Sequence, residues 1–150
     1  MIDIYSKGEY PADVLSNFYP NGFEIDGVKC RSMESFLQSL KYKNTRRQIE
    51  VCALDGKKAK QNALAKKWFK KQALWWRGKR YKRDGVEYQE LLKRAYSELA
   101  KNAVFAKALK DSGNEPLAHS IGKQSPKETI LTEREFCDLL MNLRNGRSSP

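Results

Sequence analysis

The sequence of 150 residues has no long apolar run and little cysteine. No segment approaches the roughly 20 consecutive apolar residues of a membrane span, and the first residues lack the charged and apolar sections of a secretory signal. The three cysteines, Cys30, Cys52 and Cys137, form an odd, widely spaced set without metal-site spacing. We therefore expect a soluble cytoplasmic protein with reduced thiols and no membrane partner.

Motifs of the common nucleotide enzymes are also missing. The chain has no glycine-rich phosphate loop, no nucleophile elbow and no HExxH zinc motif. His119 is its only histidine and no cysteine lies near it, so no standard set of metal ligands is expected. Kinase, P-loop, Rossmann and serine-hydrolase activities therefore lack support. What remains is chemistry by carboxylate, amide and cationic side chains, without a cofactor or metal.

Acidic residues are absent from residues 57–83, although this stretch holds twelve of the 29 basic residues. The rest of the chain has 17 basic and 18 acidic residues, so the net charge of +11 comes entirely from this stretch. Such a localised positive field favours a phosphorylated or polyanionic partner. A lysine-rich helix that faces solvent is the alternative.

Hydrophobic periodicity predicts a mainly α-helical protein with a small β element near the N-terminus, an α+β class. The length suits one domain, which we place at residues 1–146, with residues 147–150 as a flexible tail. Strands are expected at residues 2–5 and in a hairpin that turns at Asp26-Gly27. Helices are expected at residues 32–41, 45–53, 57–69, 84–99, 102–112 and 132–143.

Local signals mark the helix starts and the loops between them. Residues 7–13 hold glycine, proline and aspartate and are expected to form a loop. Residues 114–130 lack periodicity, and a long loop inside a small domain is often functional. The helix at 45–53 is expected to turn Ile49, Cys52 and Ala53 inward. The expected N-caps and capping boxes are Ser32, Asn102, Asp84 with Glu87, and Thr132 with Glu135.

The helix at 32–41 carries both an apolar and a polar face. Glu34, Gln38 and Lys41 align on the polar face at positions i, i+4 and i+7. Glu34 is the second residue of the helix, where the helix dipole favours an ionised carboxylate. Such a carboxylate suits the stabilisation of a developing cation, while an ordinary solvated helix face is the alternative.

Two further features fit either a nucleotide-like ligand or a purely structural role. His119 lies beside Ser120 in the long loop, where it could order a phosphate or a ribose hydroxyl or transfer a proton; a solvated histidine is the alternative. Trp68, Trp75 and Trp76 alternate with lysine and arginine, so they could stack on bases or belong to the core. The stretch has no recognised nucleic-acid motif.

Four segments resemble, in order, the motifs of the NADAR (YbiA-like) family. They are LSNFYP at 15–20, FEIDG at 23–27, SMESFLQSLK at 32–41 and LLMNLR at 139–144. The resemblance implies a compact, mostly helical YbiA-like fold and N-glycosidase activity. Members of the family cleave the bond between ribose C1′ and a nitrogen, in phosphorylated ribosylamino-pyrimidine intermediates of riboflavin synthesis or in ADP-ribose attached to guanine.

The resemblance also implies roles for individual residues. Glu34 would be the carboxylate that opposes an oxocarbenium-like state, with Lys41 as a second catalytic residue. The other polar residues around Glu34 would be Asn17 and Gln38. The residues that stack on the base would be Phe18 and either Trp75 or Trp76.

Two positions depart from the family pattern. Many members have a histidine where this chain has Ser35, and many have a Trp-Gly pair in the late loop, which here reads LAHSIGK at 117–123. His119, Lys123 and Glu133 are therefore this chain's own candidates on the phosphate or base side, and His119 is also a catalytic candidate. We expect a small phosphorylated ribosyl or ADP-ribosyl substrate, with modified nucleic acid as the other candidate partner. The alternative function is a non-catalytic module that binds an ADP-ribose-like nucleotide or nucleic acid.

Overall fold

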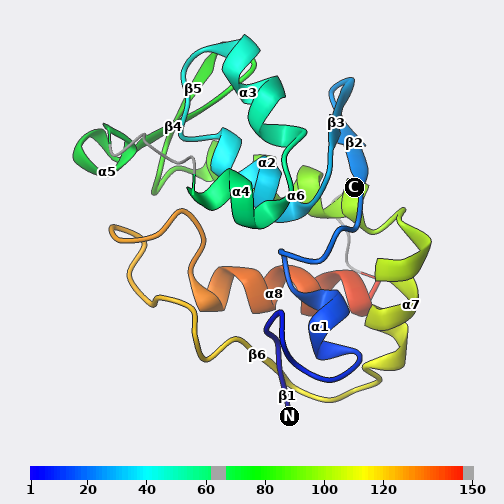
Figure 1. The fold of residues 1–150 in the computed structure, drawn as a ribbon. Helices are drawn as coiled ribbons and strands as arrows, with labels where there is room; N and C mark the ends of the chain where they lie inside the picture. Colours follow the sequence, from blue (N-terminus) through cyan, green and yellow to red (C-terminus); the bar gives the residue numbers. More distant parts are fainter. Residues whose placement is uncertain (62–66, 147–150) are drawn as a thin grey trace.

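The computed structural model describes residues 1–61 and 67–146, arranged as in Figure 1. The tail expected at 147–150 and the centre of the helix expected at 57–69 lie outside these described residues. The elements in chain order are β1 (Ile2–Asp3), α1 (Ala12–Leu15), β2 (Phe23–Ile25), β3 (Val28–Cys30), α2 (Met33–Ser39), α3 (Thr45–Cys52), α4 (Gly56–Gln61), α5 (Lys67–Lys71), β4 (Ala73–Trp76), β5 (Lys79–Lys82), α6 (Val86–Leu99), α7 (Ala103–Asp111), β6 (Leu117–Ala118) and α8 (Glu133–Arg144).

One hydrophobic core connects most of these elements. Helix α2 lies against α3, α4 and α6, and α6 packs in turn on α8 and β2. From α6 the core takes the stripe that the periodicity predicts, with Tyr88, Leu92 and Tyr96 fully buried. Figure 1 shows α8 crossing below α2 and α4, while the loop from β6, drawn in yellow and orange, curves back to the start of α8. The predicted α+β class is confirmed.

Among the described residues the β structure consists of three separate two-stranded sheets. The predicted hairpin β2–β3 is confirmed: Phe23 pairs with Cys30, and Asp26 and Gly27 form the turn with φ angles of 50° and 79°. Strand β1 pairs in parallel with β6. This pairing brings the N-terminal residues beside the loop that contains His119.

The hairpin β4–β5 is not predicted by the periodicity. All four residues of β4 are buried, so the strand shows no alternation of apolar and polar residues. The two turn residues, Arg77 and Gly78, have φ angles of 52° and 89°, the left-handed geometry that two-residue hairpin turns require. Strand β5 exposes its lysines and its arginine and turns only Tyr81 inward.

Three of the four predicted helix caps are present in the structure. The expected box of Asp84 and Glu87 is wrong, because α6 starts after Gly85 without a side-chain cap and Glu87 pairs with Lys79 instead. Helix α1 occupies the end of a segment expected as loop. The confirmed N-caps are Ser32 for α2, Asn102 for α7, and Thr132, whose box with Glu135 opens α8.

The buried face of α3 differs from the predicted one. Ile49 is 49% exposed, while Gln48 is buried. The amide of Gln48 is inside because its Nε2 donates to the Trp75 carbonyl of β4 at 2.7 Å. Its Oε1 accepts from the backbone amide of Arg77. Of the three residues expected to face inward, Cys52 does so, whereas Ala53 is exposed like Ile49.

All three cysteines are buried and free of disulfides. Two of them lie on neighbouring elements, Cys30 on β3 and Cys52 on α3, and Cys137 lies on α8. None of the helices in the described ranges has the length and hydrophobicity that a bilayer crossing requires.

The roles of Gln48 and Ile49 can be separated by substitution. Gln48→Ala should lower the free energy of unfolding by about 1–3 kcal/mol, because it leaves buried backbone groups of the β4 strand and its turn without partners. Ile49→Ala should change it by less than about 1 kcal/mol, because half of the side chain is already in solvent. Urea unfolding of both variants measures the difference. A larger loss for Ile49→Ala than for Gln48→Ala would contradict the observed orientation of α3.

Candidate functional site

The polar face of α2 opens on a cavity of about 500 Å³. The other walls come from residues 16–18, the end of α4, α5 and the loop between β6 and α8. Glu34, Gln38 and Lys41 all line this cavity, so the face that their spacing predicts is a cavity wall and not an open helix surface. The volume lies within the range of about 300–1,000 Å³ that is typical of small-molecule sites.

Glu34 and Gln38 are joined by a hydrogen bond in the cavity wall. Gln38 Nε2 donates to Glu34 Oε2 at 2.7 Å. The Gln38 side chain is buried, and its Oε1 has no hydrogen-bond partner among the described residues. A buried acceptor without a partner costs free energy. Gln38 Oε1 is therefore available to a donor group of a ligand.

Burial raises the pKa of the Glu34 carboxyl above its ordinary value of 4.5. The Gln38 amide and the charges of Lys60 and Lys41 act in the opposite direction but do not outweigh burial. The expectation that the helix dipole keeps Glu34 in its easily ionised form is therefore wrong in direction, because desolvation is the larger effect. A cavity carboxyl with a raised pKa is typical of functional sites.

Asn17 is held at the cavity by a residue of the core. Tyr96 of α6 is fully buried and donates from its hydroxyl to Asn17 Oδ1 at 2.8 Å. The backbone carbonyl of Asn17 also accepts from the Glu34 amide at 2.9 Å. These two bonds fix Asn17 against the start of α2 and leave its Nδ2 as a donor for a ligand.

Three lysines give the cavity a positive field. Lys41, Lys60 and Lys123 all line it. Burial lowers the pKa of Lys41; the Glu34 carboxylate opposes this effect, and the charges of the other two lysines add to it. Lys60 Nζ also lies 5.5 Å from the centroid of the Phe18 ring, which lines the cavity too. An anionic ligand would therefore meet both cations and an aromatic face.

His119 lines the cavity from the opposite side, in the loop after β6. Its Nδ1 lies 2.7 Å from the Ile4 carbonyl oxygen. Because a carbonyl only accepts, the proton of this bond is on Nδ1, and Nε2 is left for a ligand. The ring packs edge-on against Phe136, and a Cβ at Gly122 would lie 2.6 Å from its Cδ2. His119 is thus a fixed group and not a solvated side chain.

Trp75 and Trp76 do not line the cavity, so the expectation that one of them stacks on a base there is wrong. Strand β4 is buried on both faces, and Trp76 is anchored by a hydrogen bond from its Nε1 to Asp26 at 2.8 Å. The tryptophan that lines the cavity is Trp68 of α5, beside its neighbour Phe69. A base would therefore meet the α5 aromatic pair.

Glu133 also lies outside the cavity lining, contrary to expectation. Its two carboxylate oxygens accept hydrogen bonds from the side chain of Gln124 and from the backbone amide of His119, and these bonds lower its pKa. Glu133 therefore holds the backbone of His119 in place from outside the cavity. Lys123, expected in the same role, does line the cavity.

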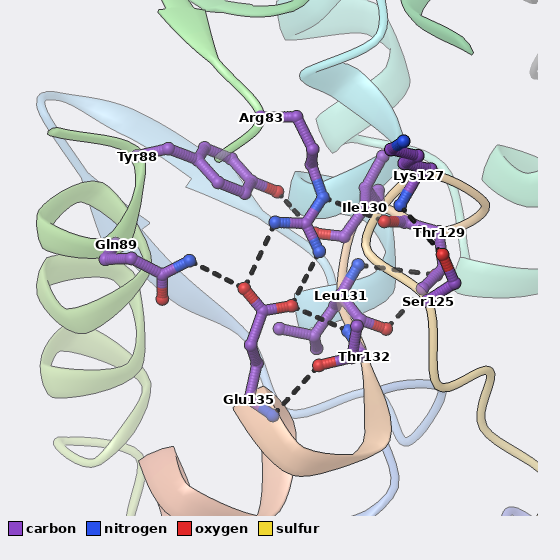
Figure 2. A network of polar contacts seen from close by, with 10 residues as sticks. All are labelled: Arg83, Tyr88, Gln89, Ser125, Lys127, Thr129, Ile130, Leu131, Thr132 and Glu135. Carbon is purple, nitrogen blue, oxygen red and sulfur yellow. Dashed lines mark hydrogen bonds and ion pairs between the residues drawn. The ribbon is translucent and has the colours of Figure 1, made fainter. Parts of the chain in front are cut away.

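A buried ion pair holds the loop that forms one cavity wall (Figure 2). Arg83, the residue directly after β5, donates to both oxygens of Glu135 at 3.1 and 2.6 Å, and its Nε donates to the Thr129 carbonyl at 2.8 Å. Tyr88 of α6 donates to the Ile130 carbonyl at 2.7 Å, and Gln89 donates to Glu135 at 2.6 Å. Because Thr129 and Ile130 line the cavity, this network fixes the position of that cavity wall.

The supporting residues of the site are harder to find in the sequence than the cavity groups. Tyr96 belongs to the apolar stripe of α6, and only its hydroxyl, which needs a partner when buried, signals a second role. Arg83 is one of twelve basic residues in its stretch, and nothing in the sequence separates it from its exposed neighbours. In the part of the chain that the structure describes, no group of three or more His, Cys, Asp or Glu side chains could hold a metal ion.

The chain has a YbiA-like α+β fold. The NMR structure of the E. coli protein YbiA matches it with a TM-score of 0.63 at 15% sequence identity, over 97% of this chain and 86% of that one. The YbiA-like fold expected from the sequence resemblance is therefore confirmed.

Sequence comparison identifies the family. The family model described as bacteriophage protein GP30.3 matches residues 9–145. A 17.1 kDa protein from the Gp30–rIII intergenic region of Enterobacteria phage T4 is 36% identical, with 97% of each chain covered. The chain belongs to the GP30.3 family of bacteriophage proteins.

The buried ion pair leads to a prediction about stability. Arg83→Met should lower the free energy of unfolding by about 3–5 kcal/mol, because it leaves the Glu135 charge buried without its cationic partner. Adding Glu135→Gln should restore much of this loss, because the amide can keep the capping box without a charge. Lys79→Met removes an exposed pair with Glu87 and should cost less than about 1 kcal/mol. Urea unfolding measures all three, and no recovery in the double variant would contradict this account.

The raised pKa of Glu34 leads to a prediction about pH. The folded protein holds this proton more tightly than the unfolded chain, so ionisation disfavours folding as the pH rises above 4.5 towards the folded pKa. Glu34→Gln should therefore raise the melting temperature at pH 8, by about 2–4 °C per kcal/mol of relieved desolvation, and the gain should vanish near pH 4. Glu24→Gln makes the same change at an exposed position and is the control. A loss of stability at pH 8 would contradict the raised pKa.

Proposed function

We propose that the protein is an N-glycosidase that hydrolyses the ribose C1′–N bond of an anionic, nucleotide-like substrate. The observation that carries the proposal is Glu34: a carboxyl with a raised pKa, in a cavity bordered by Lys41, Lys60 and Lys123. The lysines would attract phosphate, and the carboxyl would act on the sugar. The YbiA-like fold and the sequence motifs around Glu34 agree with this chemistry.

The chemistry needs a negative charge beside C1′. The C1′–N bond breaks with its electron pair leaving on nitrogen, and the sugar passes through an oxocarbenium-like state. In a desolvated cavity the Gln38 amide and the nearby lysines stabilise an ionised Glu34 only in part, so a positive charge on the sugar would interact with it strongly. The Glu34 carboxylate would also accept the proton of the water that forms the new C1′–O bond.

The leaving nitrogen must gain a proton, and two groups at the cavity can supply it. Lys41 has a pKa lowered by burial, which makes its ammonium a readier donor. His119 holds its Nδ1 against the Ile4 carbonyl and, when protonated, can donate from Nε2. Lys41→Met and His119→Asn should differ in their pH profiles of kcat, and the variant that loses the alkaline limb identifies the acid.

The remaining cavity groups would bind the substrate. Asn17 Nδ2 and Gln38 Oε1 offer one donor and one acceptor to the ribose hydroxyls. Phe18 and Trp68 provide aromatic faces for the base. Lys123 lies on the loop side of the cavity, where a phosphate of the substrate would meet its charge.

Release of the base tests the proposal. The protein should be incubated separately with an ADP-ribosylated guanine nucleotide and with a ribosylamino-pyrimidine phosphate, and the free base measured by chromatography and mass spectrometry. We expect release from one of them, and Glu34→Gln should lower kcat by about 10²–10³-fold or more while the protein still binds ligand.

Glu24→Gln, which makes the same chemical change on the exposed face of β2, is the control and should keep full activity. Unchanged turnover in Glu34→Gln would remove this residue from the mechanism. Release of neither base would contradict the enzyme proposal, and tight nucleotide binding without release would identify a binding module instead.

A further inference from the structure

Lys41 differs from the other two lysines that line the cavity. Lys60 and Lys123 are exposed, whereas Lys41 is half-buried directly after the end of α2. We infer that Lys41 is a nucleophile that forms a covalent bond to C1′ of the sugar once the base has left. The inference rests on the proposed function, because that reaction is what places C1′ beside Glu34. It adds a covalent sugar–enzyme intermediate to the proposed hydrolysis.

The backbone on both sides holds Lys41 in place. The Lys41 amide donates to the Gln38 carbonyl at 3.2 Å. The carbonyl of the preceding residue, Leu40, accepts from the Trp75 amide of β4 at 2.9 Å. Lys41 follows Glu34 by seven residues, which is about 10.5 Å along a helix axis. Because side chains of a helix lean towards its N-terminus, the long stem of Lys41 can cover much of this distance within the cavity that both residues line.

The surroundings of Lys41 favour a free amine, which is the form that attacks carbon. Burial lowers the pKa of Lys41; the Glu34 carboxylate opposes this effect, and the charges of Lys60 and Lys123 add to it. Over the described ranges Lys41 forms no ion pair, so no bond to a carboxylate has to break before the amine reacts. If Lys41 protonates the leaving base, that transfer itself produces the free amine.

The covalent step needs no oxidant or reductant. The lone pair of Lys41 Nζ attacks C1′ and forms a C1′–N bond, and Nζ passes one proton to the Glu34 carboxylate. The C1′–O4′ bond then breaks with its electron pair going to O4′, which takes the proton from Glu34, and a protonated imine remains. Water adds to C1′ while Glu34 accepts its proton. Cleavage of the C1′–N bond then releases the sugar and returns Lys41 to its amine form.

Reductive trapping tests this inference without requiring release of a base. The protein is incubated at pH 7 with ribose 5-phosphate, whose open-chain form carries a C1′ aldehyde, and with cyanoborohydride, which reduces an imine to a stable secondary amine. Peptide mass spectrometry then identifies the labelled lysines. Lys41 should be labelled at least about tenfold faster than the exposed Lys29 and Lys110, because each unit of lower pKa gives about tenfold more free amine.

Lys41→Arg separates the nucleophile from the charge. Arginine keeps the cation but does not form an imine, so this variant should lose the adduct at position 41 and still bind ribose 5-phosphate in a calorimetric titration. Lys29→Arg is the matched control, because it makes the same change at an exposed position outside the cavity lining. It should leave the labelling of Lys41 unchanged.

The outcomes separate this inference from the proposed function. Labelling of Lys60 or Lys123 ahead of Lys41, or equal labelling of all lysines, would overturn the inference. An adduct at Lys41 without release of a base from either substrate would support the covalent site while the N-glycosidase proposal fails. Release of a base without an adduct at Lys41, under the same trapping, would overturn the inference and leave the N-glycosidase proposal in place.

Discussion

Helix α2 is buried along almost its whole length, and much of the structure follows from this constraint. Helices α3, α4 and α6 and strand β3 all pack against it. A helix with this many neighbours has no face left for solvent, so its polar residues need protein partners or a cavity. Glu34 and Gln38 face the cavity, whereas Ser35 and Ser39 donate hydroxyl hydrogen bonds to backbone carbonyls. Among the described residues, the cavity is thus the one direction in which α2 can present charge.

Two carboxyls show how differently the molecule treats a partly buried acid. For Glu135, burial opposes ionisation, but Arg83, the Thr132 amide and Gln89 outweigh it and lower the pKa. For Glu34, burial prevails because a single amide, from Gln38, donates to it. The first group is committed to holding the loop, whereas the second is left able to change its charge when a ligand arrives. Opposed environments of this kind commonly separate structural from reactive carboxyls.

Local signals predict much of the fold, and distant contacts account for what they miss. The Asp26-Gly27 turn, the cap at Ser32 and the stripe of α6 are all readable within a few residues, and all three are confirmed. The inward position of Gln48 could not be read in this way, because its partner Trp75 lies 27 residues away. Strand β4 carries no alternation to reveal it, since both of its faces are buried.

In the candidate site, too, local signals predict some features and distant contacts determine the others. The shared face of Glu34, Gln38 and Lys41 follows from helical spacing alone. Which tryptophan reaches the cavity does not, because it depends on how α5 packs against β4. The hydrogen bond between Tyr96 and Asn17 joins residues 79 positions apart, and no periodicity indicates such a contact.

The parallel pairing of β1 with β6 has a consequence for how the protein is made. His119 receives its orientation from Ile4, 115 residues earlier, and Ser120 binds Asp3 in the same region. A ribosome releases the chain from its N-terminus, so Glu34 and Asn17 emerge long before the loop that faces them. The cavity can close only when the last third of the chain has been synthesised. Until then the nascent protein holds one wall of its pocket without the other and cannot enclose a ligand.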